Sequence, residues 1–153
     1  MSLLDLVAEA RRSNDLSVLI GSTPYNKFMN IAPENSTGEL LTRMRYDPQL
    51  IGNRMLPALH GGTIGALLES AAIFQVLWEI ETIAIPKIIT ITVDYLRSGR
   101  PVDTLARATL TKQGRRVVNV AVEAWQDDRA RPIASANAHF LVSPRDREDE
   151  PNH

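Results

Sequence analysis

The sequence predicts an α+β fold in which one long apolar helix is wrapped by an antiparallel β-sheet. Residues 61–80 have helical length and are apolar or small on nearly every side. After Pro86 come four stretches of alternating apolar residues, rich in Val, Ile and Thr and separated by turn sequences. A helix that is apolar all round must be covered nearly all round. A curved antiparallel sheet can provide that cover.

The chain before the long helix is interpreted as a helical segment followed by a hairpin. Four apolar residues at helical spacing within residues 3–8 predict a short amphipathic helix, and residues 15–20 predict a further turn. Residues 27–46 contain two strand-like runs around a Pro/Asn/Ser/Gly turn. We expect residues 47–57 to form an irregular loop.

The alternating stretches after the helix predict four long strands. They cover residues 88–96, 105–113, 117–125 and 133–142. We expect consecutive strands to be neighbours in an antiparallel β-meander. The sequence thus predicts a single domain over residues 1–142, in which residues 1–21 are an N-terminal helical segment. The charged tail, residues 143–153, is expected to be disordered.

Composition excludes several classes of function. A chain of 153 residues suits one domain, and its lack of cysteine excludes a thiol nucleophile, a disulfide framework and cysteine-based metal sites. The three histidines are scattered without metal-ligand spacing. A formal net charge of −1 provides no global basic field for nucleic acid. We therefore expect neither a metal nor a nucleic-acid partner.

The N-terminal sequence "MSLLDLVAEARR" has acidic residues among its apolar ones. It lacks the basic start and long apolar core of a signal peptide. We also expect no apolar run long enough to span a bilayer. These features, with the absence of cysteine, favour a cytoplasmic protein without a membrane partner.

The stretch "LHGGTIGALLESAAI", residues 59–73, places one carboxylate, Glu69, inside the apolar helix. At about 100° per residue, Gly62, Gly65 and Ala66 lie on the same side of the helix as Glu69. Helical side chains lean toward the N-terminus, so the carboxylate points over a strip without bulk. This strip could be a slot for a narrow ligand. The alternative is that small residues allow close packing and that Glu69 bonds a backbone group.

The helix begins with His60, Gly61 and Gly62. Its first N–H groups lack intrahelical partners and lie at the positive end of the helix dipole, where a carbonyl oxygen gaining negative charge can bind. The alternative is that the glycines only make a tight turn. For His60 we favour a structural role in orienting this turn over a role as general base. His139, in an apolar strand, is expected to be a core or interface histidine.

Gly61 and Glu69 are eight residues apart, which is roughly 12 Å along a helix axis. One helix is poorly placed to bring both groups to one small reacting centre. Two antiparallel helices from two subunits could each supply the start of one to the middle of the other. An active site at these residues therefore predicts a symmetric dimer with two composite sites.

The segments "HGGTIGALLESAA", "ITVDYLRSGRP" and "ATLTKQGRR" resemble the hotdog-fold acyl-CoA thioesterases of the phenylacetate-pathway (PaaI-like) type, over roughly residues 53–142. The resemblance implies dimers that often pair into tetramers, and hydrolysis of acyl-CoA thioesters. No cofactor is implied, since coenzyme A is part of the substrate. The resemblance further implies that Glu69 is the nucleophile or general base. It implies that the Gly61 amide of the partner subunit polarises the thioester carbonyl.

Relatives often use an Asn or Gln upstream of the histidine to position water. Asn53 and Gln49 are the candidates here, and Thr90 and Thr92 lie near a second position that some relatives use. Many relatives carry Asp where this chain has Glu69.

Basic turns are candidates for binding the anionic coenzyme A, because arginine forks suit phosphate groups. The resemblance gives the "LRSGRP" turn more weight than "KQGRR". The candidate substrate-binding residues are Gly62, Arg97, Ser98, Gly99, Arg100, Arg115 and Arg116.

Two alternative functions each require a sequence feature that this chain lacks. One is a non-catalytic acyl-CoA-binding or sensor module, but a sensor should carry a DNA-binding segment, and the sequence has no recognisable helix-turn-helix. The other is a hydratase or dehydratase on the same fold, whose longer His-containing motif is not found. For the acyl group, Phe74 and Trp78 could line a pocket or pack in the core.

Overall fold

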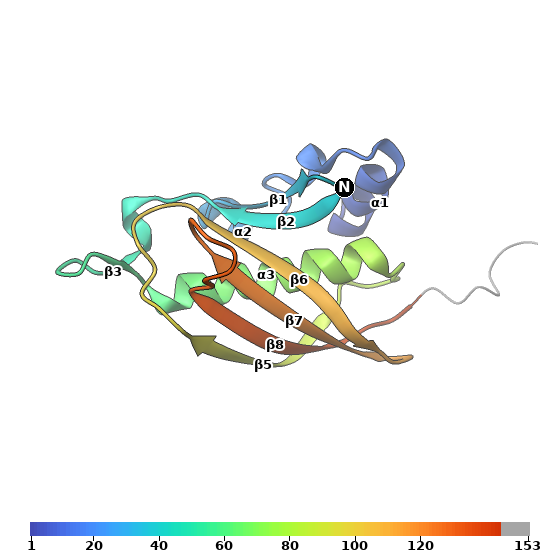
Figure 1. Ribbon diagram of the computed structural model, residues 1–153. Coiled ribbons are helices and arrows are strands. Elements are labelled where there is room, and N and C mark those ends of the chain that lie inside the picture. The colour runs from blue at the N-terminus through green and yellow to red at the C-terminus, as the bar shows by residue number, and fades with distance from the viewer. Residues whose placement is uncertain (145–153) are drawn as a thin grey trace, which may run out of the picture.

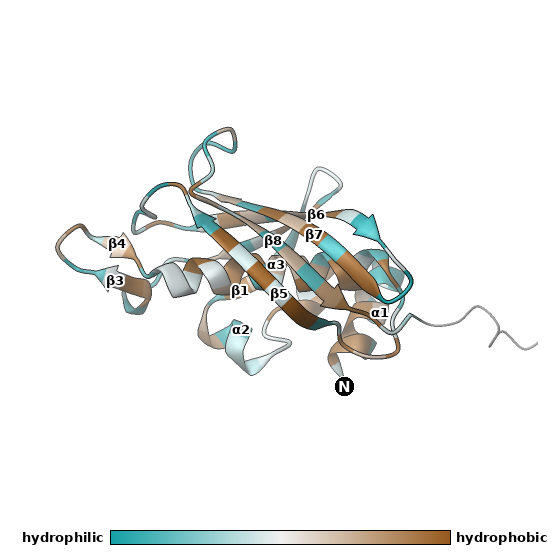
Figure 2. Cartoon of the chain, turned by 90° about the horizontal axis from the view of Figure 1, so that it is seen from below, coloured by the Kyte–Doolittle hydropathy of each residue, from teal (hydrophilic) through white to brown (hydrophobic). Residues whose placement is uncertain are grey.

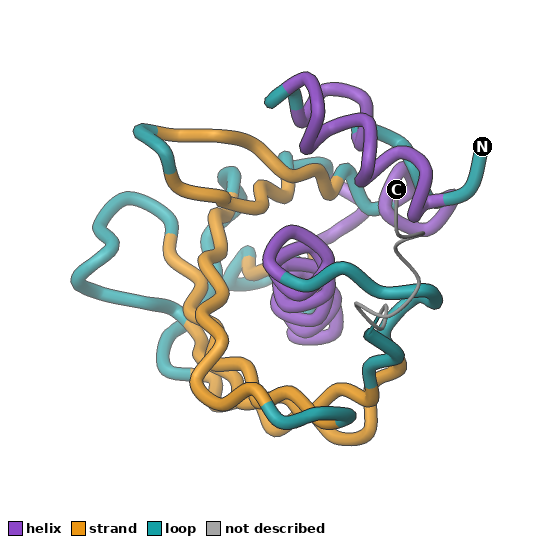
Figure 3. Tube along the Cα trace, turned by 90° about the vertical axis from the view of Figure 1, so that its right-hand side faces the viewer, coloured by secondary structure: helices purple, strands orange, loops and turns teal. Residues whose placement is uncertain are grey.

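The computed structural model describes residues 1–144 and shows a six-stranded antiparallel sheet curved around a central helix (Figure 1). The view along the axis of this helix shows the strands in an arc around it (Figure 3). The predicted α+β fold is therefore confirmed. Its helices are α1 (Leu3–Ser13), α2 (Pro24–Phe28) and α3 (Gly61–Glu79), with 3₁₀ turns at Leu16–Leu19 and Pro48–Leu50. Its strands are β1 (Ile31–Ser36), β2 (Glu39–Met44), β3 (Ile51–Asn53), β4 (Ala58–Leu59), β5 (Lys87–Tyr95), β6 (Thr104–Gln113), β7 (Val117–Trp125) and β8 (Ala134–Leu141).

The helix α3 forms the centre of the hydrophobic core. Leu67, Leu68 and Val76 are fully buried, although they point to different sides of the helix. Each such side chain contributes roughly 1.5–3 kcal/mol relative to exposure. By length and composition alone α3 could cross a bilayer, so the expectation that no run is long enough was wrong. Its position inside the sheet identifies it as a core helix.

The order of the strands differs from the predicted four-strand meander. The sheet runs β1-β2-β6-β7-β8-β5, so β6, β7 and β8 are consecutive neighbours as expected. However, β5 pairs with β8 and lies at an edge, while β6 pairs with β2. The segment after β5 carries the chain across the end of the sheet to the far side of the meander. Apolar alternation predicts the strands themselves, but it does not specify which strands are neighbours.

The N-terminal segment packs on the C-terminal half of α3. Val7 and Ala10 of α1 bury themselves against Phe74 and Leu77 in a second, smaller apolar cluster. As predicted, α1 is followed by a short turn. Ser2 and Asp5 form a reciprocal capping box at the start of α1, which satisfies N–H groups that the helix leaves free.

Two local predictions need correction. The strand-like run was placed too early, because Pro24–Phe28 is the short helix α2, capped by the Thr23 hydroxyl with Pro24 at its first position. The loop predicted at residues 47–57 contains the 3₁₀ turn at Pro48–Leu50 and β3 of the hairpin that β3 forms with β4. Pro144, at the start of the expected tail, forms an isolated β-bridge with Thr82. Residues 145–153 of the expected disordered tail lie outside the described residues.

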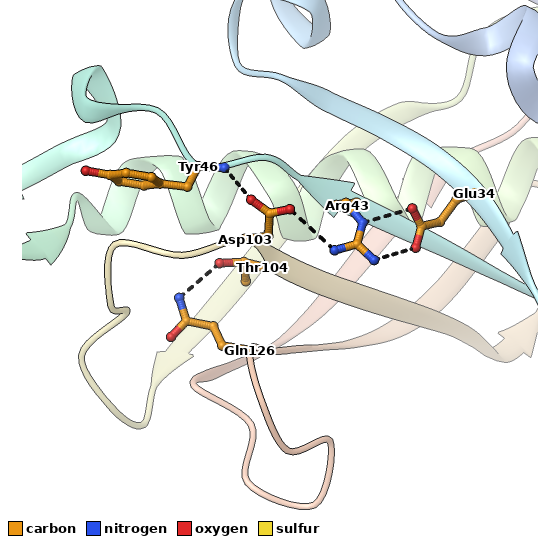
Figure 4. A network of polar contacts seen from close by, with 6 residues as sticks. All are labelled: Glu34, Arg43, Tyr46, Asp103, Thr104 and Gln126. Carbon is orange, nitrogen blue, oxygen red and sulfur yellow. Dashed lines mark hydrogen bonds and ion pairs between the residues drawn. The ribbon is translucent and has the colours of Figure 1, made fainter.

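Ion pairs tie the N-terminal hairpin to the rest of the sheet. Arg43 on β2 makes two hydrogen bonds of 2.9 Å to Glu34 on β1 and reaches Asp103, which also accepts the Tyr46 N–H (Figure 4). At the other end of β2, Glu39 accepts two hydrogen bonds from Arg129, at 2.7 and 2.8 Å. Arg129 holds the pKa of Glu39 below its ordinary value.

We predict that Glu39→Gln lowers the free energy of unfolding by up to about 1 kcal/mol at neutral pH, as expected for a partly exposed ion pair. Because the pKa of Glu39 is lowered by folding, its contribution is present above the unfolded pKa and is lost as pH falls through the folded one. The difference in unfolding free energy between wild type and Glu39→Gln should therefore begin to shrink below about pH 4.3, the pKa of Glu in an unfolded chain, and disappear at lower pH. Urea unfolding at several pH values measures it. Glu9→Gln, in an exposed pair with Arg12, is the control, and a Glu39 difference that persists at acid pH would refute this account.

Candidate active site

A pocket of about 510 Å³ lies beside α3, between β5 and the N-terminal segment. Glu69 lines it together with Gly62, Gly65 and Ala66, the strip of small residues predicted from helical geometry. The strip therefore lines a cavity, which is the first of the two alternatives that the sequence left open. The other lining residues are Leu3, Thr23, Tyr25, Asn26, Ser70, Ile73, Phe74, Ile85, Ile91 and Val93.

The Glu69 side chain is partly buried in this pocket. Within residues 1–144 its carboxylate has no hydrogen-bond donor and no ion-pair partner. The alternative in which Glu69 bonds a neighbouring backbone group is thus absent from the described structure. A carboxylate with free acceptor positions in a largely apolar pocket can bind or deprotonate a ligand.

His60 caps the start of α3. The Nδ1 atom of its ring accepts the Gly62 backbone N–H at 2.9 Å. The backbone N–H of His60 donates to the Leu50 carbonyl at 2.8 Å. A Cβ on Gly52 would lie 2.7 Å from the His60 Cα, so only glycine in β3 allows this close approach. Since Nδ1 is the acceptor in the cap, the ring orients the glycine turn, the role favoured from the sequence.

The two glycine amides at the helix start differ in availability. The Gly62 N–H is occupied by His60, whereas the part of the chain that the structure describes holds no acceptor for the Gly61 N–H. Gly61 therefore offers a free donor at the positive end of α3. Gly62 lines the pocket but cannot donate to a second acceptor without losing the cap.

Tyr95, at the end of β5, is a site residue that the sequence analysis missed. Its hydroxyl donates to the Gly61 carbonyl at 2.8 Å, and a Cβ on Gly61 would lie 3.3 Å from its ring. The contact fixes the first peptide of α3 against the edge strand. Tyr95 belongs to the "DYLR" sequence already singled out, but the sequence does not show that this strand end meets the helix start.

The structure does not bring Gly61 and Glu69 together within one chain, because both lie on α3. None of the four candidate water-positioning residues lines the pocket of its own chain. Asn53 accepts the Met55 N–H in the β3–β4 hairpin, and Gln49 donates to the Phe28 carbonyl. Thr90 and Thr92 are exposed residues of β5.

His139 is not the core residue that its apolar strand suggested. It is exposed on β8, and its Nδ1 lies 3.1 Å from the Thr90 hydroxyl on the neighbouring strand. Strand residues alternate between faces, and His139 falls on the outer face between the buried Ala138 and Phe140. An interface role in an assembly stays a prediction.

The "LRSGRP" turn packs directly on the segment that leads into α3. The Leu59 N–H donates to the Gly99 carbonyl, and a Cβ on Gly99 would lie 3.1 Å from the Leu59 side chain. Gln126 holds the turn by two hydrogen bonds with the Arg100 backbone and also bonds Thr104, a contact visible in Figure 4. The turn is therefore fixed beside the helix start.

The side chains of this turn line a hollow of about 370 Å³ that also contains Arg131. Arg97 donates to the Pro132 carbonyl at 2.6 Å, and Arg100 pairs with Asp127. Ser98 is exposed at the same rim. Arg131 and Gln126 are polar residues here that the sequence analysis did not identify.

Arg115 and Arg116 lie far from this turn. They line a different hollow with Ser143 and Pro144 at the end of the sheet where Lys87 faces Leu141. The "LRSGRP" turn follows Tyr95, at the opposite end of β5. The two predicted basic clusters are thus separated by the length of a strand, and one chain does not bring them together.

The two aromatic residues considered for the acyl pocket differ in their positions. Phe74 both lines the pocket and packs in the smaller apolar cluster, while Trp78 packs against that cluster without lining the pocket. Among the described residues, no group of three or more His, Asp or Glu side chains is arranged to hold a metal ion.

Comparisons with known proteins agree on one family. A family model described as the acyl-CoA thioesterase N-terminal domain matches residues 53–141. The medium/long-chain acyl-CoA thioesterase YigI of Salmonella typhimurium is 33% identical over 134 residues, covering 78% of this chain and 85% of the relative.

Solved structures share the fold of this chain. A Chromobacterium violaceum protein is 40% identical and superposes with a TM-score of 0.73, covering 91% of this chain and 97% of its own. A Bacillus halodurans protein crystallised with CoA shares the fold at 19% identity, with a TM-score of 0.72 and coverages of 94% and 92%. The α3-centred fold and these matches show that the chain is a thioester hydrolase and belongs to the acyl-CoA thioesterase family, with the hotdog fold.

Proposed function

We propose that the protein hydrolyses an acyl-CoA to the free acid and CoA at a site built around Glu69. The observation that carries this proposal is the unpartnered Glu69 carboxylate in a pocket lined by small and apolar residues. As a base, Glu69 takes a proton from water while the water oxygen attacks the thioester carbon. As a nucleophile, it attacks that carbon itself. In both cases the carbon–sulfur bond breaks and the CoA thiolate leaves with a proton to become free CoA. In the nucleophilic route, water then hydrolyses the anhydride formed between the acyl group and Glu69, which releases the acid and restores the carboxylate.

The oxyanion donor in this proposal is the Gly61 N–H of a partner subunit. The free amide at the positive end of α3 supports this role. The roughly 12 Å between Gly61 and Glu69 along one helix prevents one chain from offering both groups to the same carbon. Two antiparallel α3 helices related by a twofold axis would form two such sites.

Several exposed features support a homodimer. β5 is an edge strand whose outer side has no partner in residues 1–144. Apolar residues recur along its length (Figure 2). An unpaired edge of this length can pair with a second copy. The β3–β4 hairpin projects beyond the start of α3 (Figure 1), with Met55 and Leu56 exposed near its tip. In the antiparallel dimer this tip would extend along the C-terminal half of the partner's helix.

The acyl group would lie along α3 beyond Glu69, between Ile73 and Phe74 and the facing Ile91 of β5. The size and apolar lining of the pocket support an acyl chain of medium length. The activity of the YigI relative on medium- and long-chain acyl-CoA agrees with this choice.

The CoA end would lie at the turn formed by Arg97, Ser98, Gly99 and Arg100. This turn is fixed against the segment entering α3, so it adjoins the proposed oxyanion donor of its own chain. Arginine forks recognise phosphate groups well. Arg115 and Arg116 lie at the other end of the sheet and would reach the same CoA only from another subunit.

We predict that Glu69→Gln lowers kcat by roughly two to four orders of magnitude, as expected when a general base is lost. The variant should still fold and bind acyl-CoA, because Gln keeps the size of the side chain. Glu69→Asp should keep partial activity. The measurement is CoA release over a series of acyl-CoAs. Glu79→Gln, at the exposed end of the same helix, is the matched control, and a Glu69→Gln turnover within about threefold of wild type would overturn the mechanism.

Mixed dimers test the composite site. Gly61→Val should abolish turnover, because its side chain would press on Tyr95 and cover the amide. In a dimer of one Glu69→Gln chain and one Gly61→Val chain, one site would keep both native groups. An equal mixture that exchanges subunits should therefore regain about a quarter of wild-type activity. No recovery in a mixture with demonstrated exchange would show that each chain forms its own site, and a monomeric protein would exclude the composite site.

We predict that Arg97→Ala and Arg100→Ala each raise KM about two- to fivefold with a smaller change in kcat. A change in KM of this size corresponds to the free energy of one exposed charge pair. The effect should shrink as salt is added, because exposed charges are screened. Arg12→Ala on the surface of α1 is the control. Unchanged KM in both variants would place the CoA phosphates elsewhere.

A further inference from the structure

One wall of the Glu69 pocket carries polar side chains that the reaction described above does not use. Thr23 and Asn26 come from α2 and its cap, and Ser70 comes from α3. The Ser70 hydroxyl donates to Asn26 Oδ1 at 3.2 Å, and the Asn26 N–H donates to the Thr23 hydroxyl oxygen at 3.3 Å. Ser70 is only 8% exposed. The short helix α2 therefore presents an ordered polar patch to a pocket whose other walls are mostly apolar.

This patch has hydrogen-bonding capacity left over. Because Asn26 Oδ1 accepts from Ser70, the side-chain NH₂ group of Asn26 keeps two N–H donors. No acceptor for them lies within the described part of the chain, residues 1–144. The hydroxyl hydrogen of Thr23 has no acceptor there either. Leaving such donors unpaired against a buried hydrocarbon chain is costly.

The patch lies on the acyl side of the carboxylate. The long Glu69 side chain leans toward the start of α3, over Gly65 and Ala66. The short Ser70 side chain stays at its own level, one residue further along the helix. A carbonyl carbon held at the Glu69 carboxylate would extend its acyl chain past Ser70 and Asn26 before reaching Ile73 and Phe74. The patch would thus meet the first few carbons of the chain.

We propose that the Asn26–Ser70 pair is a specificity subsite for an oxygen substituent, a hydroxyl or oxo group, on the acyl chain close to the thioester. A hydroxyl would accept from the Asn26 amide and donate to Thr23, and an oxo group would accept from the amide alone. A few placed polar groups in an apolar pocket commonly set specificity in this way. This inference rests on the proposed function, since it assumes that the acyl chain occupies the Glu69 pocket.

The test compares kcat/KM for decanoyl-CoA, β-hydroxydecanoyl-CoA and β-oxodecanoyl-CoA. Wild type should favour the oxygenated substrates by about tenfold, the value of one neutral hydrogen bond with a partly buried group. Asn26→Leu, similar in size but without the amide, should bring the ratio of kcat/KM for the oxygenated substrates to that for decanoyl-CoA close to one. Ser70→Ala should also lower the preference for the oxygenated substrates over decanoyl-CoA. Alanine at this helical position should not impair folding.

Lys27→Leu is the control, because Lys27 lies on the same short helix and, unlike Asn26, lines only the neighbouring hollow and not the Glu69 pocket. It should leave the ratio unchanged. A wild-type ratio near one, or a ratio that Asn26→Leu does not alter, would overturn the subsite while leaving thioester hydrolysis at Glu69 intact. If wild type hydrolysed all three substrates and Glu69→Gln did so equally well, the proposed mechanism itself would be wrong. The two failures are therefore distinguishable.

Discussion

The burial of α3 is the constraint on which the rest of the structure depends. A helix with Leu67, Leu68 and Val76 fully buried on different sides cannot rest on a flat surface. The sheet must curve around it, and α1 must cover its C-terminal half at Phe74 and Leu77. The side bearing Gly62, Gly65 and Ala66 is left without bulk, and this is where the pocket opens. The same requirement that forms the core thus determines where a ligand can bind.

The second constraint is the close packing at the start of α3. Gly52 allows the chain to approach His60, His60 occupies the Gly62 amide, and Tyr95 holds the Gly61 carbonyl. The result is that the Gly61 N–H, at the positive end of the helix, has no acceptor among residues 1–144. A substitution that disturbs any of these contacts would move that donor without touching the carboxylate at Glu69.

The sequence was most informative where periodicity alone decides the structure. The helix over Gly61–Glu79 and the strands β6, β7 and β8 follow from apolar spacing, and the small strip beside Glu69 follows from helical geometry. The edge position of β5 was not predictable in this way, because alternation does not specify the neighbour of a strand. The start of α2 is marked by Thr23 and Pro24, but its last residues, Lys27 and Phe28, also begin a strand-like run, so local pattern alone does not separate helix from strand there.

The parts of the site that escaped prediction are contacts between distant segments. Tyr95 meets Gly61 across 34 residues, and Asn26 meets Ser70 across 44. Neither pair has a local pattern, so only the folded chain reveals them. Conversely, the sequence placed Arg115 and Arg116 with Arg97 and Arg100 because all are basic turn residues, and the fold separates them. Residue type indicates what a group can bind, whereas topology decides whether two groups can bind it together.

These two kinds of information meet in the question of assembly. Within residues 1–144, one chain contains a carboxylate without a donor and an amide without an acceptor, both on one rigid helix and roughly 12 Å apart. Bending α3 to bring them together would disrupt the core that it organises. A twofold arrangement of two intact helices joins them at no such cost, and β5 is the unpaired edge along which two sheets could meet. The rigidity that makes α3 a good core is therefore the reason that its start and its middle should act in different subunits.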